Sequence, residues 1–253
     1  MGRHRIHANA TERKRANRAL HRARLQAPCV QIGALVTLYL GDAHVIAPTL
    51  QPIDALVTDP PYGVHFDFTK RRRTAARWTA NMRGDDQPFD PTHWLRYPQV
   101  ILWGAHRYRL PAANGYITWD KRGGATPDDF PGCELAWSNV PGCSAVHTQL
   151  WRGNRRAGEE NIVHGWKLHP AQKPVALMRL CVEKTTGTVL DPFMGSGTTG
   201  VACVRLGRPF VGIEIDPQCF DEARKRLQAE VATAHQVELF PVQKAGGMGA
   251  TAR

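Results

Sequence analysis

The sequence predicts a doubly wound α/β domain built on a mostly parallel sheet. Three short runs of apolar and β-branched residues predict buried strands: Ala55–Thr58, Thr188–Leu190 and Phe210–Ile215. Each run ends in a polar or glycine-containing turn, and helical patterns follow the second and third runs. Strands that alternate with helices are typical of parallel sheets, and 253 residues can bury one substantial core.

The other elements are predicted from the same patterns, in chain order. Thr11–Gln26 has apolar residues at helical spacing, and Asp42–Leu50 is a short helix or a loop. Further strands are predicted at Val36–Leu40, Val100–Trp103, Tyr116–Trp119, Glu134–Ser138 and Thr148–Trp151. Further helices are predicted from Pro174 to near Gly187, over Val201–Leu206, and from Asp216-Pro217 with Phe220, Ala223 and Leu227 facing inward.

Charge divides the chain into an arm, a domain and a tail. Residues 1–28 carry eight Lys and Arg against one acid, 8 − 1 = +7, which leaves 25 − 21 = +4 for the other residues. A basic arm on a basic domain is typical of nucleic-acid-binding proteins, and the alternative is a solubilising tail. Residues 29–230 are predicted to form the domain, and residues 231–253 a tail whose end is rich in Gly and Ala.

Two classes of protein are disfavoured by the composition. No apolar run reaches eighteen residues, so we expect no membrane span. The six cysteines show no C-x-x-C spacing, so we expect free thiols rather than a metal site or disulfides.

The tetrapeptide Asp59-Pro60-Pro61-Tyr62 directly follows the strand predicted at 55–58. Open α/β sheets bind ligands at the carboxyl ends of their strands, where this tetrapeptide is expected to lie. Asp59 and the Pro60 carbonyl are two acceptors for an exocyclic amine, and the Tyr62 ring offers a stacking surface. The segment therefore predicts a pocket for an extruded nucleobase.

A glycine-rich turn, Asp191–Gly200, follows the strand at 188–190 and precedes a helix. It lacks the Lys-Ser/Thr pair of a phosphate-binding loop, and its spacing differs from G-x-G-x-x-G. Glu214 ends the next strand, at the place where an acid accepts hydrogen bonds from ribose hydroxyls. A βαβ unit without phosphate-binding features favours an adenosyl ligand that lacks phosphates, such as S-adenosylmethionine.

Together these motifs resemble the β-type DNA amino-methyltransferases, in which the Asp-Pro-Pro-Tyr motif precedes the cofactor glycine motif. Leu40-Gly41-Asp42, His169–Pro174 and Gly212-Ile213-Glu214 are in the same register, and the similarity covers residues 36–230. The resemblance implies a Rossmann-like S-adenosylmethionine-dependent methyltransferase fold with a circularly permuted motif order and a seven-stranded sheet. It divides the domain into a catalytic half (36–151), a connecting segment (152–171) and a cofactor half (172–230).

The resemblance also implies roles for individual residues, in chemistry that needs no metal. Asp59, Pro60, Pro61 and Tyr62 would be catalytic, and Glu214 would bind the cofactor ribose. Further cofactor contacts are implied for Asp42, Lys173, Asp191, Pro192, Phe193, Gly195, Ser196, Gly197 and Thr198. Alternatively, Asp191 caps a helix and Glu214 is a solvated acid at a strand end.

In the resembled family, Asp at the first position of the tetrapeptide goes mostly with adenine N6, and Ser mostly with cytosine N4. Asp59 therefore favours adenine in double-stranded DNA, with cytosine N4 in DNA and adenine N6 in RNA as alternatives. A non-catalytic DNA-binding protein is disfavoured because the tetrapeptide and Glu214 are intact. The short segment 152–171 resembles compact phage and prophage enzymes rather than large restriction-linked ones, which implies a cytoplasmic monomer or dimer in a bacterial or phage-infected cell.

Two further segments are candidates for contacts with macromolecules. The loop 63–90 leaves directly from the tetrapeptide and holds cationic residues interleaved with aromatic ones: Lys70, Arg71, Arg72, Arg73 and Arg77. Such residues bind phosphates and fill the gap left by an extruded base, so we expect DNA contact, with a solvated loop as the alternative. Gln236–Phe240 resembles the Gln-x-x-Leu-Phe peptide that docks on the bacterial sliding clamp; alternatively, its two apolar residues pack on the domain.

Overall fold

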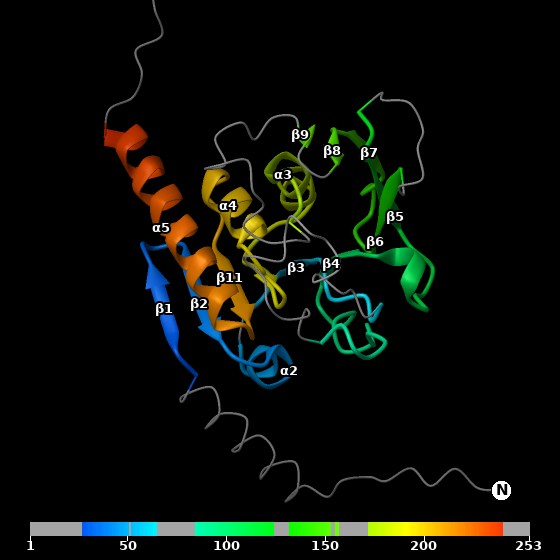
Figure 1. Cartoon of the computed structure of the whole chain (residues 1–253), viewed down its shortest axis with the longest axis horizontal. Helices are drawn as coiled ribbons and strands as arrows, with labels where there is room; N and C mark the ends of the chain where they lie inside the picture. The colour runs from blue at the N-terminus through cyan, green and yellow to red at the C-terminus, as the bar shows by residue number, and fades with distance from the viewer. Residues whose placement is uncertain are drawn as a thin grey trace, which may run out of the picture.

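The computed structural model describes residues 27–50, 52–64, 84–123, 132–152, 155–156 and 172–239. Its centre is a nine-stranded sheet in the order β1-β2-β11-β10-β3-β4-β6-β5-β7 (Figure 1). Five consecutive strands of this sheet are parallel: β2 (Val36–Leu40), β11 (Phe210–Glu214), β10 (Val189–Asp191), β3 (Ala55–Thr58) and β4 (Gln99–Trp103). Their carboxyl ends therefore lie along one edge of the sheet.

The sheet continues past β4 in mixed orientation. Strand β6 (Cys133–Ser138) is antiparallel to both β4 and β5 (Gly115–Asp120), and β7 (Ala145–Thr148) is parallel to β5. Strand β1 (Cys29–Ile32) closes the opposite edge, antiparallel to β2. The α/β class and the mostly parallel sheet are confirmed.

The predicted number of seven strands is wrong, because β1 and β7 extend the sheet at its two edges. Both are only four residues long, and most of their side chains are exposed or half-buried, so they carry a weak signal in a sequence. The strand predicted at Thr148–Trp151 is also misplaced, since Thr148 ends β7. Trp151 begins β8 (Trp151–Arg152), which pairs with β9 (Arg155–Arg156) in a separate ribbon.

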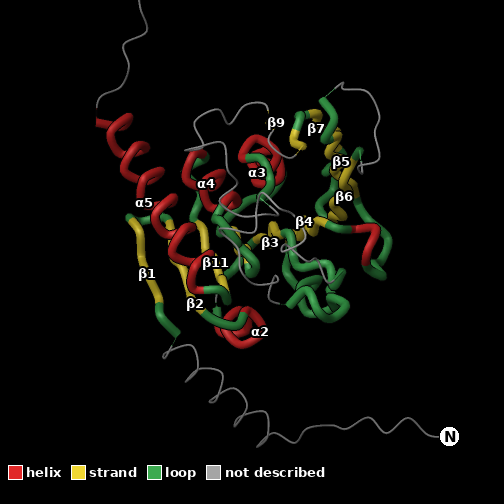
Figure 2. Tube along the Cα trace, viewed as in Figure 1, coloured by secondary structure: helices red, strands yellow, loops and turns green. Residues whose placement is uncertain are grey.

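Helices cover both faces of the sheet (Figures 1 and 2). On one face lie α3 (Val175–Glu183), α4 (Thr198–Arg205) and α5 (Pro217–Leu239); on the other lie α2 (Ala43–Ile46) and the 3-10 turn η1 (Ala47–Thr49). A second 3-10 turn, η3 (Ala105–Arg107), follows β4. Successive residues of β3 point to opposite faces of the sheet. Val57 packs on the side of α3–α5, and Leu56 packs on the side of α2.

The helix boundaries differ from the sequence expectations at three places, the first being α3, which ends at Glu183, before the end expected near Gly187. Helix α4 begins at Thr198, before the predicted Val201, because the glycine turn leads straight into it. Helix α5 continues to Leu239, so residues 231–239 extend the helix beyond the boundary expected at residue 230. Helix α3 follows Pro174 as predicted. The helix expected at Thr11–Gln26 lies outside the described residues.

Candidate active site

The tetrapeptide lies at the carboxyl end of β3, in the middle of the parallel edge. The Tyr62 hydroxyl donates a hydrogen bond to Oδ1 of Asp59 at 2.5 Å. Burial raises the pKa of Asp59 above its ordinary value, and burial together with the neighbouring Asp59 charge raises the pKa of Tyr62. The side chain of Asp59 is only 17% exposed, so the carboxylate is largely shielded from bulk water.

Two residues that belong to no predicted motif, Asp85 and Gly104, hold Tyr62 in this position. Buried Asp85 accepts hydrogen bonds from the backbone N–H groups of Gly63 (2.8 Å) and Val64 (3.2 Å), which fixes the turn after Tyr62. Gly104, after β4, has a φ of 81°, and a Cβ there would lie 2.5 Å from Cε1 of Tyr62. The site thus needs a glycine at 104 so that the Tyr62 ring can lie against the backbone.

Lys173 lies beside the tetrapeptide, whereas the resemblance implies a contact with the cofactor. Its ammonium donates to Oδ2 of Asp59 and lies 3.0 Å from Oε2 of Glu134. Oε1 of Glu134 accepts in turn from Lys121. Burial alone would raise the pKa of Glu134, but Lys173 and Lys121 lower it to about 2. Neither Glu134 nor Lys121 carries a sequence signal, because both stand at the ends of ordinary strands.

The glycine turn leaves β10 next to the tetrapeptide. Oδ1 of Asp191 accepts from Thr58 Oγ1 at 2.7 Å, and Oδ2 accepts from Thr199 Oγ1 at 2.5 Å. Burial raises the pKa of Asp191 to about 6. Asp191 therefore organises the turn, while the N-cap position of α4 is occupied by Gly197.

The remaining residues of this turn form the wall of the parallel edge. Gly195 and Gly197 have φ values of 51° and 74°, which favour glycine, and a Cβ at Gly197 would lie 3.2 Å from side-chain atoms of α5. Ser196 and Thr198 are buried, and Arg226 of α5 donates to the Ser196 carbonyl (3.2 Å) and to Oγ1 of Thr198 (3.0 Å). These contacts fix the turn to helix α5.

Glu214 ends β11, and Asp42 lies two residues after the end of the neighbouring strand β2, at the same edge. Oε2 of Glu214 accepts from the Gly195 N–H at 2.9 Å, and Oε1 accepts from the Asp216 N–H at 2.8 Å. Burial raises the pKa of Glu214 to about 7, although backbone hydrogen bonds from Asp216, Gly195 and Ile215 oppose that shift. The Gly41 N–H donates to the Glu214 carbonyl at 2.8 Å, and Asp42 caps α2 by accepting from the His44 N–H at 2.8 Å.

A row of aromatic rings connects the glycine turn with the tetrapeptide. Phe193 packs edge-on against Trp94 and Phe89, with centroids 5.1 and 5.5 Å apart. Phe89 lies 5.2 Å from Tyr108, which lies 6.2 Å from Tyr62. A continuous apolar wall therefore runs between the two motifs, and only Phe193 and Tyr62 in it are predicted from the sequence.

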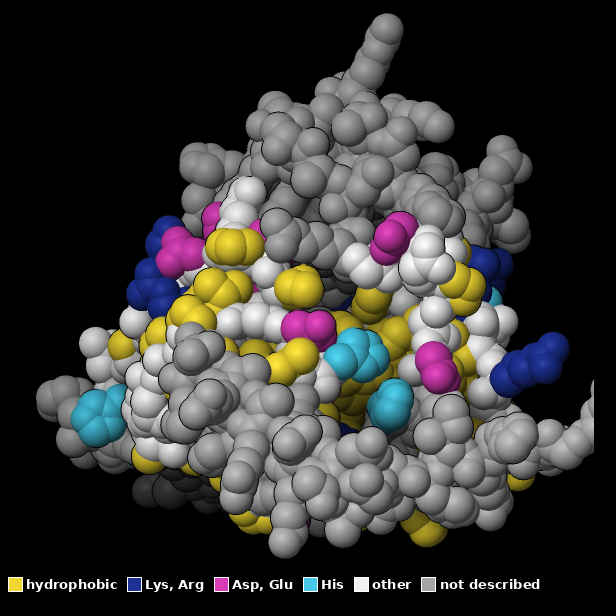
Figure 3. Space-filling model, turned by 90° about the horizontal axis from the view of Figure 1, so that it is seen from below, with side chains coloured by type: hydrophobic (Ala, Val, Ile, Leu, Met, Phe, Trp, Pro, Cys, Tyr) yellow, Lys and Arg dark blue, Asp and Glu magenta, His cyan; other side chains and the backbone are white. Residues whose placement is uncertain are grey.

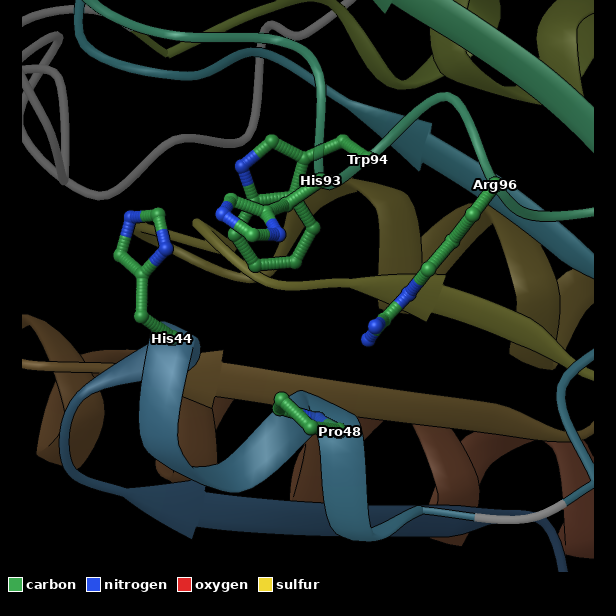
Figure 4. Close-up of a pocket in the computed structure, with 5 residues that line it drawn as sticks. All are labelled: His44, Pro48, His93, Trp94 and Arg96. Carbon is green, nitrogen blue, oxygen red and sulfur yellow. The ribbon is translucent and has the colours of Figure 1, made fainter. Parts of the chain in front are cut away.

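A pocket of about 210 Å³ opens beside Trp94 (Figure 4). His44 and Pro48 line it from α2 and η1, and His93, Trp94 and Arg96 line it from the segment before β4. Seen from below, the molecule shows a recess floored by hydrophobic side chains and bordered by histidine and acidic side chains (Figure 3). No residue of this pocket belongs to a predicted motif.

Several predicted contacts lie outside the described residues. These are the arm 1–26, His169, Phe240, and the cationic residues Lys70, Arg71, Arg72, Arg73 and Arg77. Gln236–Leu239 form the last turn of α5, so the clamp-binding hypothesis stays a prediction. Within the described ranges, the six cysteines are free, no cluster suits a metal ion, and no helix is long and apolar enough to span a membrane.

Comparison with known families identifies part of the chain. Residues 137–225 match the model of a protein family that is described as DNA methylase, of the N6/N4 type. The matched segment includes Lys173, the glycine turn and Glu214, whereas the Asp59 tetrapeptide precedes it.

Two curated relatives are similar over short alignments. Type II methyltransferase M2.DpnII of Streptococcus pneumoniae is 50% identical over 68 residues, which are 26% of this chain and 25% of that protein. Type II methyltransferase M.HinfI of Haemophilus influenzae is 36% identical over 99 residues, which are 37% of this chain and 28% of that protein. The chain thus spans about a quarter of the length of each of these relatives.

Two solved structures are also similar. The M1.HpyAVI–S-adenosylmethionine complex is 26% identical, with a TM-score of 0.46, over 76% of this chain and 100% of that one. The cytosine-N4-specific PvuII DNA methyltransferase is 14% identical, with a TM-score of 0.48, over 82% of this chain and 94% of that one.

Proposed function

We propose that this protein transfers a methyl group from S-adenosylmethionine to the N6 amine of an adenine extruded from double-stranded DNA. One observation carries the proposal: the tetrapeptide and the glycine turn leave adjacent parallel strands, β3 and β10, at the same edge. A hydrogen bond of 2.7 Å joins Thr58, the residue before the tetrapeptide, to Asp191, the first residue of the glycine turn. A base amine on Asp59 and a ligand on the glycine turn would thus be neighbours.

The residues at this edge fit an adenosyl ligand. The Glu214 carboxylate accepts backbone hydrogen bonds from Gly195, Ile215 and Asp216. An ionised carboxylate has about four acceptor sites, so capacity remains for a ribose hydroxyl. The glycine turn presents backbone, and Phe193 lies in the aromatic row. Asp42 follows the adjacent strand β2 and is exposed at the same edge. We assign Glu214 to the ribose and the 191–198 turn to the methionine part.

Asp59 and the Pro60 carbonyl prepare the amine for attack. Its lone pair is delocalised into the purine ring, so the free amine is a weak nucleophile. Two acceptors on its N–H bonds favour a tetrahedral nitrogen with a localised lone pair, and the Tyr62 ring stacks on the base. When bound, S-adenosylmethionine supplies an electrophilic methyl group on a sulfonium. The N–H proton becomes acidic only as the N–C bond forms, so Asp59 need not be a strong base.

The proposal also specifies which base is methylated and which nucleic acid carries that base. Asp at position 59, rather than Ser, favours adenine N6 over cytosine N4. The basic arm and the cationic residues of the loop 63–90 favour duplex DNA as the partner, in the bacterial cytoplasm. The order of the two motifs along the chain, tetrapeptide first, supports the circularly permuted arrangement. Cytosine N4 in DNA is the second candidate.

The test is methylation of unmethylated duplex DNA with labelled S-adenosylmethionine, followed by nucleoside digestion and mass spectrometry. Asp59→Asn, which keeps the side-chain shape, should abolish N6-methyladenine, whereas Glu183→Gln, at an exposed position of α3, should not change its yield. N4-methylcytosine instead of N6-methyladenine would overturn the choice of base. Label in RNA, and none in DNA, would overturn the choice of substrate.

A further inference from the structure

The ammonium of Lys173 lies between two carboxylates in the interior of the site. It bonds Oδ2 of Asp59 and lies 3.0 Å from Oε2 of Glu134, and its side chain is only 8% exposed. Its Nζ also lies 5.6 Å from the Trp103 ring centroid and 5.9 Å from that of Tyr62. Trp103 and Tyr62 thus form an aromatic wall around a buried cation.

The charges along this cluster alternate in sign. Lys121 bonds Glu134, Glu134 pairs with Lys173, and Lys173 bonds Asp59, so two cations balance two carboxylates. A buried charge without a partner costs several kcal/mol, so each member depends on its neighbours. The groups that face Asp59 are Lys173 before α3, Glu134 of β6, Tyr62 of its own turn, Tyr108 after η3 and Asp191 of β10. Lys173 is the cation in this set.

We propose that Lys173 is a positioning residue for Asp59, which it keeps ionised and oriented, and that Glu134, braced by Lys121, holds Lys173 in place. The inference rests on the proposed function and deepens it, since it names what sets the charge of the amine acceptor. Because Lys173 occupies Oδ2, the carboxylate cannot rotate freely, and Oδ1 is the oxygen that remains for the base. Tyr62 donates to that oxygen when no base is bound.

Removing the cation has a predictable electrostatic result. Without Lys173, Asp59 would share its buried site with the carboxylate of Glu134, and both burial and repulsion raise the pKa of Asp59. Glu134→Gln takes away the repulsion, while the amide oxygen of the glutamine can still accept from the Lys173 ammonium and hold it against Asp59. The resulting shift in the pKa of Asp59 therefore has the opposite sign. If Lys173 and Glu134 had a merely structural role, their substitutions would not shift the pKa of Asp59 in opposite directions.

The experiment compares Lys173→Met, Lys173→Arg and Glu134→Gln with the matched control Arg179→Met, which removes an exposed cation from α3. The rate constant for methylation of duplex DNA is measured from pH 5 to 9. Lys173→Met should lower it about 100-fold at pH 7 and move its acid limb up by at least about one pH unit. Lys173→Arg should recover part of the rate, Glu134→Gln should leave the limb in place or lower it, and Arg179→Met should behave as wild type.

Affinity for S-adenosylmethionine, measured by titration calorimetry, separates this role from a contact with the cofactor. The proposal predicts an unchanged dissociation constant for Lys173→Met. A loss of about tenfold or more with no change in the acid limb would assign Lys173 to the cofactor and overturn the proposal.

A direct titration of Asp59 keeps this proposal distinct from the proposed function. Carboxyl carbon NMR, assigned with Asp59→Asn, follows Asp59 without any methyl transfer. The pKa of Asp59 should be lowest in Glu134→Gln, higher in the wild type, higher again in the double variant Lys173→Met/Glu134→Gln, and highest in Lys173→Met. If Lys173→Met does not fold, the double variant is compared with the wild type in its place. Equal pKa values would overturn the proposal. Absence of methylated DNA with this order intact would overturn only the proposed function.

Discussion

The Tyr62 hydroxyl donates to Oδ1 of Asp59 at 2.5 Å, which is the oxygen that Lys173 leaves open. In the absence of a base, both oxygens of the carboxylate are therefore engaged. The target amine has to replace the phenol, or share Oδ1 with it, before Asp59 can accept its N–H bond. The contact thus satisfies a buried carboxylate while the pocket is empty.

Tyr62→Phe should consequently retain activity much better than Tyr62→Ala. The phenylalanine ring keeps the stacking surface and loses only the hydroxyl, so we expect a rate within about tenfold of wild type. Alanine removes the base–aromatic contact, which is worth about 1–3 kcal/mol, or roughly five- to 150-fold in rate. Single-turnover methylation of duplex DNA measures both variants. Equal losses for Phe and Ala would mean that the hydroxyl, not the ring, carries the function of Tyr62.

Glu214 should make cofactor binding depend on pH. Burial raises its pKa to about 7, and only the ionised carboxylate can accept hydrogen bonds from two ribose hydroxyls. Affinity for S-adenosylmethionine should therefore rise between pH 6 and 8, as the folded protein loses this proton.

The measurement is titration calorimetry at several pH values. Glu214→Gln should bind more weakly at pH 8 and should lose most of the pH dependence, because the amide does not titrate. Glu183→Gln, at an exposed surface ion pair on α3, is the control and should match wild type. A pH profile that Glu214→Gln does not flatten would show that another group controls binding.

Sequence reasoning succeeds where a functional residue directly follows a strand. Asp59, Asp191 and Glu214 each stand at the carboxyl end of a short apolar run, and parallel strands bring such ends to one edge. Their assembly at that edge is therefore predictable from local patterns, without knowledge of tertiary contacts. Their roles remain predictions until they are tested.

Residues that meet through tertiary packing escape the same reasoning. Lys173 contacts Asp59 across 114 positions of the chain, and its partner Glu134 comes from an antiparallel strand in the mixed part of the sheet. Neither the register of β6 nor the path into α3 is encoded in a local pattern. Asp85 and Gly104 are missed for the same reason, since the tetrapeptide they support is distant in sequence.

Thr199→Val should destabilise the protein more at pH 8 than at pH 5. Burial raises the pKa of Asp191 to about 6, so its proton stabilises the folded state at low pH, and stability falls as the pH rises through that value. Thr199 donates to the carboxylate at 2.5 Å, and its loss leaves a buried charge with fewer donors. We expect a cost of about 1–3 kcal/mol at pH 8.

Urea unfolding at both pH values measures this difference. At pH 5 most of Asp191 is protonated in the folded state, so the loss of a donor to its carboxylate should matter less. Thr233→Val on the exposed side of α5 removes a hydroxyl from a comparable β-branched residue and should have a small effect at either pH. The same cost at pH 5 and pH 8 would indicate that packing of Thr199, rather than its hydrogen bond, stabilises the turn.

Gly104→Ala should inactivate the site without impairing cofactor binding. A Cβ at residue 104 would lie 2.5 Å from Cε1 of Tyr62 and 2.9 Å from Oη of Tyr108, so the Tyr62 ring must move. The backbone cost of alanine at positive φ is shared by Gly142→Ala, where φ is 68° and no atom lies within 4 Å of the new Cβ. Comparing the two variants therefore isolates the steric effect on Tyr62 from the backbone strain.

We expect the methylation rate of Gly104→Ala to fall by more than about tenfold, Gly142→Ala to retain wild-type activity, and both to bind S-adenosylmethionine normally. Equal activities of the two variants would mean that Tyr62 can leave its position against Gly104 at no cost to the reaction.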